Sequence, residues 1–484
     1  MSHGGPHGGL VLNVGEGKQL FLDDDFLVEN KIRVRPVMHQ PVKEGYPVLL
    51  PDRPWEVGGF HTGTVMFEEG VFKMWYGGLD ESLKTTCFCF ARSVDGTTWE
   101  KPSLGIHERD GSSENNIVMV LEGDEENLGT ACVFRDPRDE RAPYKLVHHY
   151  FEKSEDGQYT YGLSAATSPD GLHWERNPEP LFTDFKPFDA FNIVFWDDYL
   201  ERYVAYVRRR IRRRFPKDKR FPSEPTALRY VGRAESEDFV HWTSPEVVVL
   251  GPDGQDPPEA DYYGAGAFRY SDNAYFMMTP YFDHATDQVH LRLATSRENV
   301  TWRLAGNRTP FLPNGNPGSW DSMQIYSLVP AIVKDDLIHI YYLGLDAGHY
   351  GGVSKEEYRA NAGIGLATLP LDGFISLQAG YLPGVVTTWP LRFLGSSLFL
   401  NAELVEVNED TWPDHGIDVE VLDEEGYAIP EFSRHDCDTI RETGTDLPVQ
   451  WNGKSDLSLL VGKPVKLRFY IQFARLYSMQ FRKV

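Results

Sequence analysis

One nine-residue sequence recurs along this chain and constrains its fold more than any other feature. Residues 91–99 read Ala-Arg-Ser-Val-Asp-Gly-Thr-Thr-Trp, and residues 166–174 read Ala-Thr-Ser-Pro-Asp-Gly-Leu-His-Trp. Looser copies occupy residues 234–242 and 294–302, and a more divergent fifth copy occupies residues 367–374. Self-similarity at intervals of roughly 60 to 75 residues indicates a repeat architecture.

Each copy of this sequence has the composition of a tight turn between two strands. Ser and Asp side chains bond to nearby backbone groups, and Gly adopts a positive φ without steric cost. The Trp that follows begins the next strand and packs on its neighbours. We therefore expect one hairpin per repeat, and we interpret this motif as part of the scaffold and not as a catalytic site.

The segments between the copies contain the strands of a repeated sheet. In the first repeat, residues 61–67, 71–76 and 85–92 are expected to form three strands, and a fourth begins at Trp99. The same pattern follows in four further repeats. Four antiparallel strands per repeat, five times over, predict an all-β chain with a five-bladed β-propeller, in which ring closure removes the exposed sheet edges.

The pattern changes after residue 388. The repeat stops, and strands of alternating polarity separated by turn signals predict a C-terminal β-sandwich. The predicted organisation is a flexible N-terminal tail (1–17), a five-bladed propeller (18–388) and a sandwich accessory domain (389–484).

Charge and composition exclude several classes of function. The net charge of −24 argues against nucleic acid and against an anionic membrane surface as partners. No apolar run of about 18 residues is present. Because no signal peptide is visible, we expect a cytoplasmic location, with export open if an N-terminal segment has been removed. The cysteines lack the spacing of a zinc site, and we interpret them as buried thiols of a reducing compartment: they are Cys87, Cys89, Cys132 and Cys437.

The repeat topology predicts which mouth of the propeller carries the chemistry. The repeat hairpins lie at one mouth, so the innermost strands begin at the other, near His61, Asp189, Asp261 and Asp321. Carboxylates crowded in a concave site push their pKa values apart, as acid–base pairs require. Taken singly, each Asp could instead be a turn residue. The neighbouring residues expected to bind substrate are Asn192, Glu259, Tyr262, Trp320 and Gln324.

Loops at the same mouth add basic and aromatic side chains. Residues 208–220 contain seven Arg and two Lys, and we expect Arg208 and Arg209 to bind a carboxylate, sulfate or phosphate of the substrate. A solvated or subunit-contacting loop is the alternative. The side chains expected to stack on sugars from equivalent loops are Tyr281, His284, His349 and Tyr350. Arg135-Asp136-Pro137 falls in the hairpin between the first two strands, and we interpret it as a turn at the opposite mouth.

These features resemble a known superfamily. Five blades, Ser-x-Asp-Gly-x-x-Trp hairpins and acidic residues at the inner strand starts look like the arabinanase/levansucrase/invertase group, which includes glycoside hydrolase families 32 and 43. The resemblance covers residues 20–388, and the C-terminal region resembles the accessory β-domain of such proteins. The group takes one carboxylate from each of its first three blades. Here only Asp189 matches such a position, because His61 and Asn127 stand in the first two blades.

The predicted function is a glycoside hydrolase acting on an anionic or modified glycan. Asp189 and Asp261 are the predicted pair, one as general acid and the other as base or nucleophile. Asp321 is expected to adjust their pKa values, and His61 is a candidate acid–base partner. The alternatives are a non-catalytic glycan-binding propeller and a glycoside phosphorylase or lyase. We expect no required cofactor and no catalytic metal, although a structural Ca²⁺ in the channel is compatible with the fold. The expected partner is a carbohydrate, and homo-oligomerisation is left open.

Overall fold

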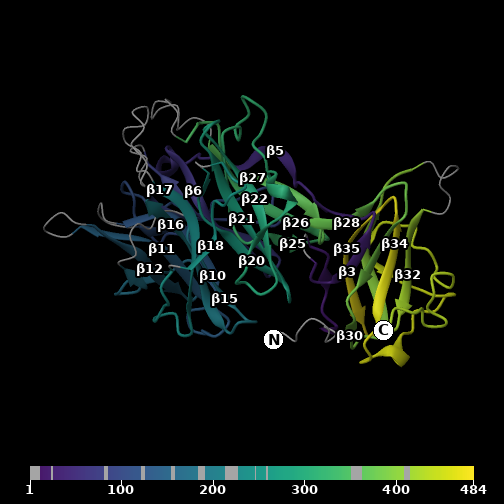
Figure 1. Cartoon of the computed structure of the whole chain (residues 1–484). Helices are drawn as coiled ribbons and strands as arrows, with labels where there is room; N and C mark the ends of the chain where they lie inside the picture. The colour runs from purple at the N-terminus through teal and green to yellow at the C-terminus, as the bar shows by residue number, and fades with distance from the viewer. Residues whose placement is uncertain are drawn as a thin grey trace.

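The computed structural model is built of strands. It describes residues 11–22, 25–80, 85–120, 126–153, 159–183, 191–212, 227–245, 247–257, 260–349, 362–407 and 415–484. In these ranges the helices are three short 3-10 turns: η1 (Pro54–Glu56), η2 (Gly306–Arg308) and η3 (Ser458–Leu460). None of the helices in the described ranges has the length and apolarity needed to cross a membrane. Figure 1 shows two groups of sheets, joined near β28.

Three separate antiparallel sheets contain the first three repeats. The first contains β6 (Gly59–Glu68), β7 (Val71–Leu79), β8 (Thr85–Ser93) and β9 (Ile117–Val120). The second contains β10 (Glu126–Arg135), β11 (Tyr144–Lys153), β12 (Tyr159–Ser168), β13 (Glu175–Arg176) and β14 (Phe182–Thr183). The third contains β15 (Ile193–Asp197), β16 (Arg202–Arg212), β17 (Ala227–Ser236) and β18 (Val247–Leu250). The first three strands expected in the first repeat are confirmed, each extended by one to three residues at an end. The fourth, expected to begin at Trp99, begins at Ile117 instead, and Glu100 forms only an isolated bridge with Arg92.

The fourth and fifth repeats share one ten-stranded sheet. The fourth contributes β19 (Asp261–Tyr262), β20 (Gly266–Ser271), β21 (Ala274–Asp283), β22 (Gln288–Ser296) and β23 (Arg303–Leu304). The fifth contributes β24 (Gln324–Ser327), β25 (Ile332–Lys334), β26 (Leu337–Leu345) and β27 (Ala362–Pro370). A single parallel pair, Val289 with Gln324, joins β22 to β24. The outer strand of the fifth repeat is β5 (Val42–Leu49), which comes from the N-terminal side and pairs antiparallel with β27.

The repeat motif forms the expected turn. In the first copy, the Ser93 Oγ accepts the N–H of Gly96 at 2.9 Å, and the Asp95 Oδ1 accepts those of Thr97 and Thr98 at 2.8 and 2.7 Å. The residue at the sixth position of every copy has a positive φ, whether or not it is glycine. These residues are Gly96 (+82°), Gly171 (+77°), Phe239 (+69°), Asn299 (+60°) and Asp372 (+62°).

The same five residues connect each repeat to the one before it. The Tyr341 hydroxyl, on β26 of the last repeat, donates to the Gly96 carbonyl of the first at 2.8 Å. The other contacts join Trp75 to Gly171, Phe134 to Phe239, Tyr206 to Asn299 and Tyr270 to Asp372. Because the first repeat is bound to the last, the repeat sheets follow one another in a closed ring.

The innermost strands converge on the axis of this ring. A small enclosed hollow is lined by residues on or next to five of them: Thr62 and Gly63 (β6), Ala131 (β10), Ile193 (β15), Gly266 (β20) and Ser327 (β24). The backbone N–H of Val133 also donates to the Thr64 Oγ1 at 2.9 Å, which joins β10 to β6. Residues at the mouths of this axis are therefore brought together from all the repeats.

Two further sheets lie beyond the fifth repeat and share one hydrophobic core. The six-stranded sheet contains β33 (Gly444–Pro448), β31 (Ser397–Leu404), β35 (Ala474–Arg482), β28 (Ile375–Ala379), β4 (Arg35–Met38) and β2 (Gln19–Leu20). The four-stranded sheet contains β3 (Val28–Ile32), β29 (Gly384–Thr388), β34 (Lys466–Gln472) and β32 (Gly416–Leu422). A separate parallel pair joins β1 (Leu12–Gly15) to β30 (Leu391–Phe393). Figure 1 shows the purple β3 among the yellow-green C-terminal strands.

The strand pairing differs from the expected division of the chain. Residues 19–38 and 375–388, which the sequence placed with the repeats, form β2–β4, β28 and β29 and pair with C-terminal strands. The change of architecture therefore falls directly after the fifth turn. Local pattern cannot reveal this, because these strands alternate like any others and their partners are hundreds of residues away.

One buried carboxylate ties the two groups of sheets together. Asp372 of the fifth turn accepts hydrogen bonds from Tyr270 on β20 (2.9 Å), Asn401 on β31 (3.0 Å) and Ser478 on β35 (2.7 Å). Lys18, from the N-terminal segment, forms an ion pair with it at 3.0 Å. The side chain of Asp372 is fully buried, so this hub is shielded from water.

Candidate functional site

The most concentrated group of polar side chains lies at the start of β19. Both oxygens of Asp261 are occupied: Oδ1 accepts the backbone N–H of Arg229 at 2.6 Å, and Oδ2 contacts the Arg229 guanidinium at 2.7 Å and the His284 Nε2 at 3.0 Å. Burial alone would raise the pKa of Asp261, but the bonds from His284 and Arg229 hold it below its ordinary value. Asp261 is therefore an anion that holds these two side chains in place.

A tyrosine forms the centre of this group. The guanidinium groups of Arg208 on β16 and Arg229 on β17 lie 4.9 and 4.4 Å from the centre of the Tyr263 ring. Arg208 also donates to the Tyr263 carbonyl at 3.3 Å. Cations over an aromatic face are attracted by its quadrupole. Two positive charges are thus concentrated next to a single carboxylate, in a chain that is strongly acidic overall.

The fifth repeat completes the group with a second imidazole. The Tyr263 hydroxyl and the His349 Nε2 are 2.8 Å apart, and the His349 Nδ1 is 3.3 Å from the Gln324 Oε1. The Phe282 ring contacts both imidazoles, with centroids 4.2 Å from His284 and 4.9 Å from His349. We name the residues joined in this way the Asp261 cluster: Arg208, Arg229, Asp261, Tyr263, His284, Gln324 and His349.

The Asp261 cluster lies next to the axis of the ring. The Asn192 Oδ1 accepts the backbone N–H of Arg208 at 3.0 Å, and Asn192 and Phe191 both line the axial hollow. Phe191 has a positive φ of 65°, an uncommon conformation for an aromatic residue, and stacks on Tyr326 at 4.7 Å. Strained backbone of this kind is concentrated at functional sites.

Exposure within the cluster is confined to its histidines. Arg208, Arg229 and Asp261 are buried, whereas the His284 side chain is 25 % exposed. A carboxylate bonded to one imidazole nitrogen fixes the tautomer, so Nδ1 of His284 is the basic nitrogen. The arrangement can therefore transfer a proton through His284 and hold an anion beside it.

Two of the predicted residues belong elsewhere. Asp321 forms an ion pair with Lys43 on β5 at 2.7 Å and accepts a hydrogen bond from the Tyr342 hydroxyl at 3.1 Å. These bonds run along the sheet towards its outer strand. Trp320 stacks on Tyr342 at 5.6 Å, in space left open by Gly344. Asp321 and Trp320 thus share no contact with the Asp261 cluster among the described residues, and they stabilise the outer part of the fifth repeat.

Tyr262 and Tyr281, expected to bind substrate, are buried in a separate network. The Arg292 Nη1 donates to Asp256 at 2.8 Å and to the Tyr262 hydroxyl at 2.9 Å. The same guanidinium lies 3.4 Å from the centre of the Tyr281 ring. Arg308 binds the second oxygen of Asp256 at 2.7 Å. Both tyrosines therefore stabilise the fourth repeat and do not offer a stacking face for a sugar.

The remaining predicted residues are distributed as follows. Asp189, Glu259 and Tyr350 lie outside the described residues. His61 is half-buried in β6, opposite Gly77. Arg209 is buried on β16, on the opposite face from Arg208 because side chains alternate along a strand. Asp136 is a turn residue, as expected: its Oδ1 accepts the N–H of Arg138 at 3.0 Å.

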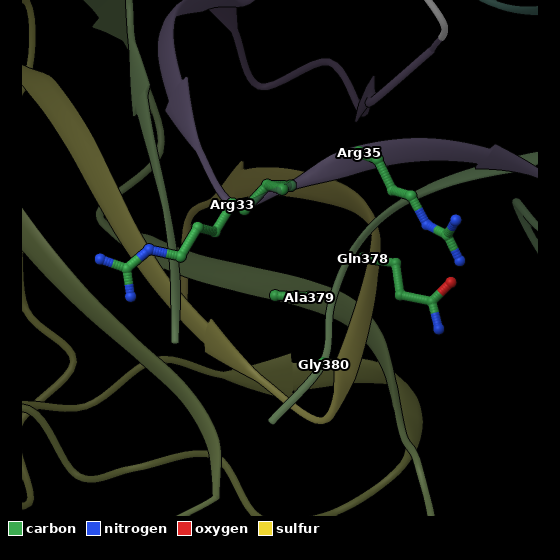
Figure 2. A pocket seen from close by; sticks show the side chains of 6 residues that line it. Arg33, Arg35, Gln378, Ala379 and Gly380 are labelled. Carbon is green, nitrogen blue, oxygen red and sulfur yellow. The ribbon is translucent and has the colours of Figure 1, made fainter. Parts of the chain in front are cut away.

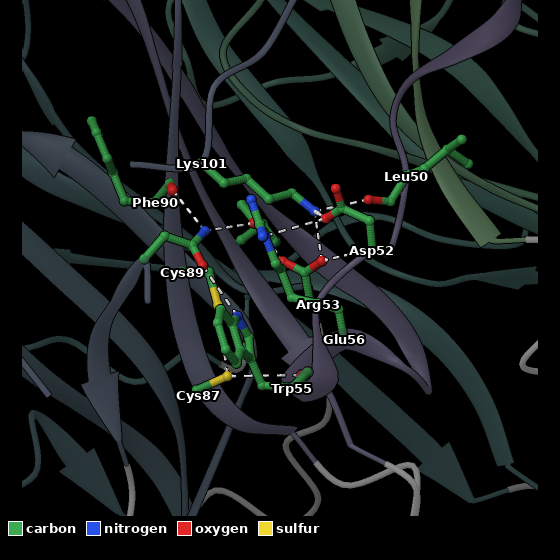
Figure 3. Close-up of polar contacts among 11 residues, drawn as sticks. Leu50, Asp52, Arg53, Trp55, Glu56, Cys87, Cys89, Phe90 and Lys101 are labelled. Carbon is green, nitrogen blue, oxygen red and sulfur yellow. Dashed lines mark hydrogen bonds and ion pairs between the residues drawn. The ribbon is translucent and has the colours of Figure 1, made fainter. Parts of the chain in front are cut away.

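One buried carboxylate, Glu56, had no signal in the sequence analysis. Its oxygens accept bonds from the Tyr76 hydroxyl at 2.7 Å and from the Lys101 ammonium at 2.5 Å, as Figure 3 shows for Lys101. Burial raises the pKa of Glu56, although Lys101 opposes this. Cys87 and Cys89 lie nearby, with sulfur atoms 3.6 Å apart. Glu56 is fully enclosed, so this network stabilises the first sheet and is not an open site.

The described residues contain no candidate metal centre. No group of three or more His, Cys, Asp or Glu side chains in this part of the chain could hold a metal ion. The structural Ca²⁺ that we considered for the channel therefore has no ligand set among the described residues.

No protein-family model matches the chain, and no curated protein matches it. Solved structures do resemble it. A thermostable family-43 glycoside hydrolase is 14% identical, with 66% of this chain and 93% of that chain covered and a TM-score of 0.43. A GH32 beta-fructofuranosidase from Bombyx mori is 10% identical, with 93% and 94% covered and a TM-score of 0.43. A beta-1,2-mannobiose phosphorylase from Listeria innocua is 12% identical, with 71% and 98% covered and a TM-score of 0.46.

The resemblance expected from the sequence, to the group that includes families 32 and 43, is thus found again among solved structures. These TM-scores are below 0.5 and the identities are low. The similarity therefore does not carry the function, which has to be argued from the Asp261 cluster.

Proposed function

We propose that this protein cleaves glycosidic bonds in a glycan that carries a negative group, as a glycoside hydrolase. The observation that supports this proposal is the Asp261 cluster. It combines a part-exposed imidazole, fixed by a buried carboxylate, with two guanidinium groups around Tyr263, beside the axis of the ring. Arg208 and Arg229 attract the anionic group of the sugar, and His284 transfers a proton.

We further propose a five-bladed propeller followed by a β-sandwich as the scaffold. The ring contacts of the five turns and the axial hollow support the blade count. The shared core of the two C-terminal sheets supports the sandwich. The propeller would then extend from β5 to β27, and the sandwich would take residues 12–38 in addition to the chain from β28 onwards.

Asp189 is the carboxylate that we propose as the partner of His284 in this reaction. Its described neighbours support the choice, because Phe191 and Asn192 contact the Asp261 cluster and the axial hollow. Asp261 is then a positioning residue, since both of its oxygens are already bonded. No cofactor takes part in the proposed reaction. The cytoplasmic location and the oligomeric state stay predictions from the sequence.

The substitution His284→Gln tests this assignment. We expect kcat to fall by about 10²- to 10⁴-fold, the usual contribution of an acid–base group, with the affinity for the glycan retained. The assay measures reducing ends released from neutral, carboxylated and sulfated oligosaccharides. His241 is a matched control, because its imidazole also contacts an aspartate, Asp238 at 2.7 Å, but lies in the third turn. Full activity of His284→Gln, or equal losses in both variants, contradicts the proposal.

A glycoside phosphorylase is the second candidate, favoured by one observation. A hydrolase needs two carboxyl groups, whereas inorganic phosphate supplies the nucleophile itself in phosphorolysis. Asp261 is the one carboxylate bonded within the described cluster, and two guanidinium groups are suited to hold phosphate. The same assay with and without inorganic phosphate separates the candidates: a sugar phosphate as product identifies the phosphorylase. Binding without any bond cleavage identifies a glycan-binding propeller.

A further inference from the structure

A hollow with no part in the proposed reaction lies where the chain crosses between the two C-terminal sheets. Its lining comes from the link between β3 and β4 and from the end of β28: Arg33, Val34, Arg35, Gln378, Ala379 and Gly380. β3 and β29 belong to the four-stranded sheet, whereas β4 and β28 belong to the six-stranded one. The link from β3 to β4 and the link from β28 to β29 therefore each pass from one sheet to the other. The hollow has a volume of about 400 Å³, within the range of about 300–1,000 Å³ that small-molecule sites occupy.

The hollow is lined by side-chain hydrogen-bond donors that no group in the described part of the chain uses. Figure 2 shows the Arg35 and Gln378 side chains next to each other, as their pairing in neighbouring strands requires, with Arg33 on the other side of Ala379. Arg33 and Arg35 are exposed, and neither side chain forms a hydrogen bond or an ion pair with another residue that the structure describes. Two such arginines are unexpected in a chain of net charge −24, where acceptors are abundant.

Exposed apolar residues adjoin this lining in the sequence. Ile32, which precedes Arg33, is 49% exposed. Tyr381 and Leu382, which follow Gly380, are 58% and 45% exposed. An aromatic or aliphatic surface packs against the C–H face of a sugar ring, and a guanidinium group binds a carboxylate or sulfate through paired hydrogen bonds. Arginine donors in the hollow, with exposed apolar residues next to them in the sequence, suit a sugar residue that carries an acidic group.

We propose that this hollow binds an anionic sugar residue of a glycan chain, a uronate or a sulfated sugar, separately from the Asp261 cluster. Arg35 binds the acidic group, Gln378 beside it bonds to ring hydroxyls, Arg33 adds positive charge from the other side of Ala379, and Tyr381 supports the apolar face. The site holds the protein on its polymer without contacting the bond that is cleaved.

The first test is calorimetric binding to the full chain of three probes: tetragalacturonate, a sulfated tetrasaccharide and neutral cellotetraose. We expect an acidic probe to bind and the neutral one not to bind. The double variant Arg33→Ala/Arg35→Ala is expected to lose one binding site, or at least tenfold in affinity. The control Arg392→Ala, an exposed arginine on β30 of the same region, is expected to change nothing. Unchanged binding in the double variant, an equal loss in the control, or binding of the neutral probe alone overturns the proposal.

A second variant tests the hollow itself while both arginines stay in place. A side chain added at Gly380 meets no atom within 4 Å, and the φ of this residue is not positive, so Gly380→Trp fills the hollow without backbone strain. We expect it to abolish the same binding. Retained binding would show that surface charge alone attracts the glycan, which overturns the proposal.

Turnover separates this proposal from the function proposed for the Asp261 cluster. The double variant should cleave a short substrate at the normal rate and a long polymer more slowly. An equal loss on both substrates overturns the separate site. If the protein cleaves no glycan but the double variant still loses binding, the enzyme assignment fails and the binding site stands.

Discussion

Burial limits the chemical role of a carboxylate at the mouth of the ring, as Asp261 shows. The sequence places it where an acid–base residue is expected, at the start of an inner strand. The structure surrounds it with Arg229 and His284, which occupy both of its oxygens. A carboxylate with a lowered pKa and no exposed oxygen neither donates a proton nor attacks a sugar. In the proposed reaction it would act only through His284, the neighbour that is part-exposed.

The substitution Asp261→Asn should destabilise the protein in a pH-dependent way. It leaves the buried Arg229 without its counter-ion, a change that typically costs about 3–5 kcal/mol. Because the pKa of Asp261 is lowered in the folded chain, its contribution is complete above its ordinary value of about 3.9 and is lost as the pH falls through the lowered one. Urea unfolding should therefore show a constant difference from wild type between about pH 7 and 5, shrinking in stronger acid.

Asp110→Asn is the control for this measurement, since Asp110 is 85% exposed and should not affect stability. An Asp261→Asn protein as stable as wild type at neutral pH would show that the pair with Arg229 does not stabilise the fold.

The repeated turn is the element that builds the ring. Its Asp and Ser side chains close the hairpin, and its sixth residue contacts the preceding repeat. Only the first two copies have Gly at that position, and there is little space for a side chain there. A Cβ on Gly96 would lie 2.7 Å from the Tyr341 hydroxyl oxygen. Later copies use Phe239, Asn299 and Asp372, whose side chains make the contact themselves. One backbone conformation is thus kept while its side chain varies.

Removing the turn carboxylate should cost stability and leave catalysis intact. Asp95→Ala deletes the acceptor of the Thr97 and Thr98 N–H groups, by analogy with helix caps a loss of about 0.5–2 kcal/mol. Asp95→Asn retains an acceptor and should lose less. Thermal unfolding and glycan turnover measured together test this, and a loss of turnover in the folded Asp95→Ala protein would contradict our placement of the turns away from the active mouth.

The outer strand of the fifth repeat depends on one ion pair that crosses the sheet. Lys43 on β5 contacts Asp321, whose side chain is 5% exposed. We expect a double-mutant cycle with Lys43→Met and Asp321→Asn to give a coupling energy of about 0.5–3 kcal/mol. Catalytic parameters should not change in the stable variants. A coupling energy near zero would mean that strand pairing with β27 alone holds β5.

For the whole molecule, Asp372 is the junction between the ring and the C-terminal sheets. It belongs to the fifth turn, yet it is bonded from the N-terminal segment, from β20 and from two C-terminal strands. We therefore expect this fully buried carboxylate with four partners to make the two parts unfold together.

Asp372→Ala should uncouple the two parts. We expect a loss of about 3–5 kcal/mol, because Lys18 and the neutral donors lose their shared acceptor. We expect one unfolding transition in calorimetry of the wild type and two in calorimetry of the variant. The matched control Asp170→Ala removes the carboxylate of another turn that lies within the ring, and it should lower stability without splitting the transition. A single transition in Asp372→Ala would contradict the role of Asp372 in coupling the ring to the C-terminal sheets.

Much of the ring was predictable because its signals are local. The turn residues, the hairpin strands and the positive φ of Gly96 and Gly171 follow from neighbouring residues alone. From their loop positions, His284 and His349 were expected at the same mouth as Asp261, and the structure brings all three into one cluster. The partners of Asp261 and Asp321 were not predictable, because they come from other repeats and from β5. Pairing between distant strands leaves no pattern in a single sequence.

The position of β5 has a consequence for the order in which the protein is made. Residues 42–49 leave the ribosome first among the strands of the ring, yet their partner β27 is synthesised more than 300 residues later. At about 5–20 residues per second, this strand waits on the order of half a minute with its edge unpaired. The strands β2–β4 wait longer still, for β29 and β35. The ring thus cannot close until β27 has been made, and the six-stranded sheet cannot be completed until β35 has been made. Premature termination would leave strand edges open to aggregation.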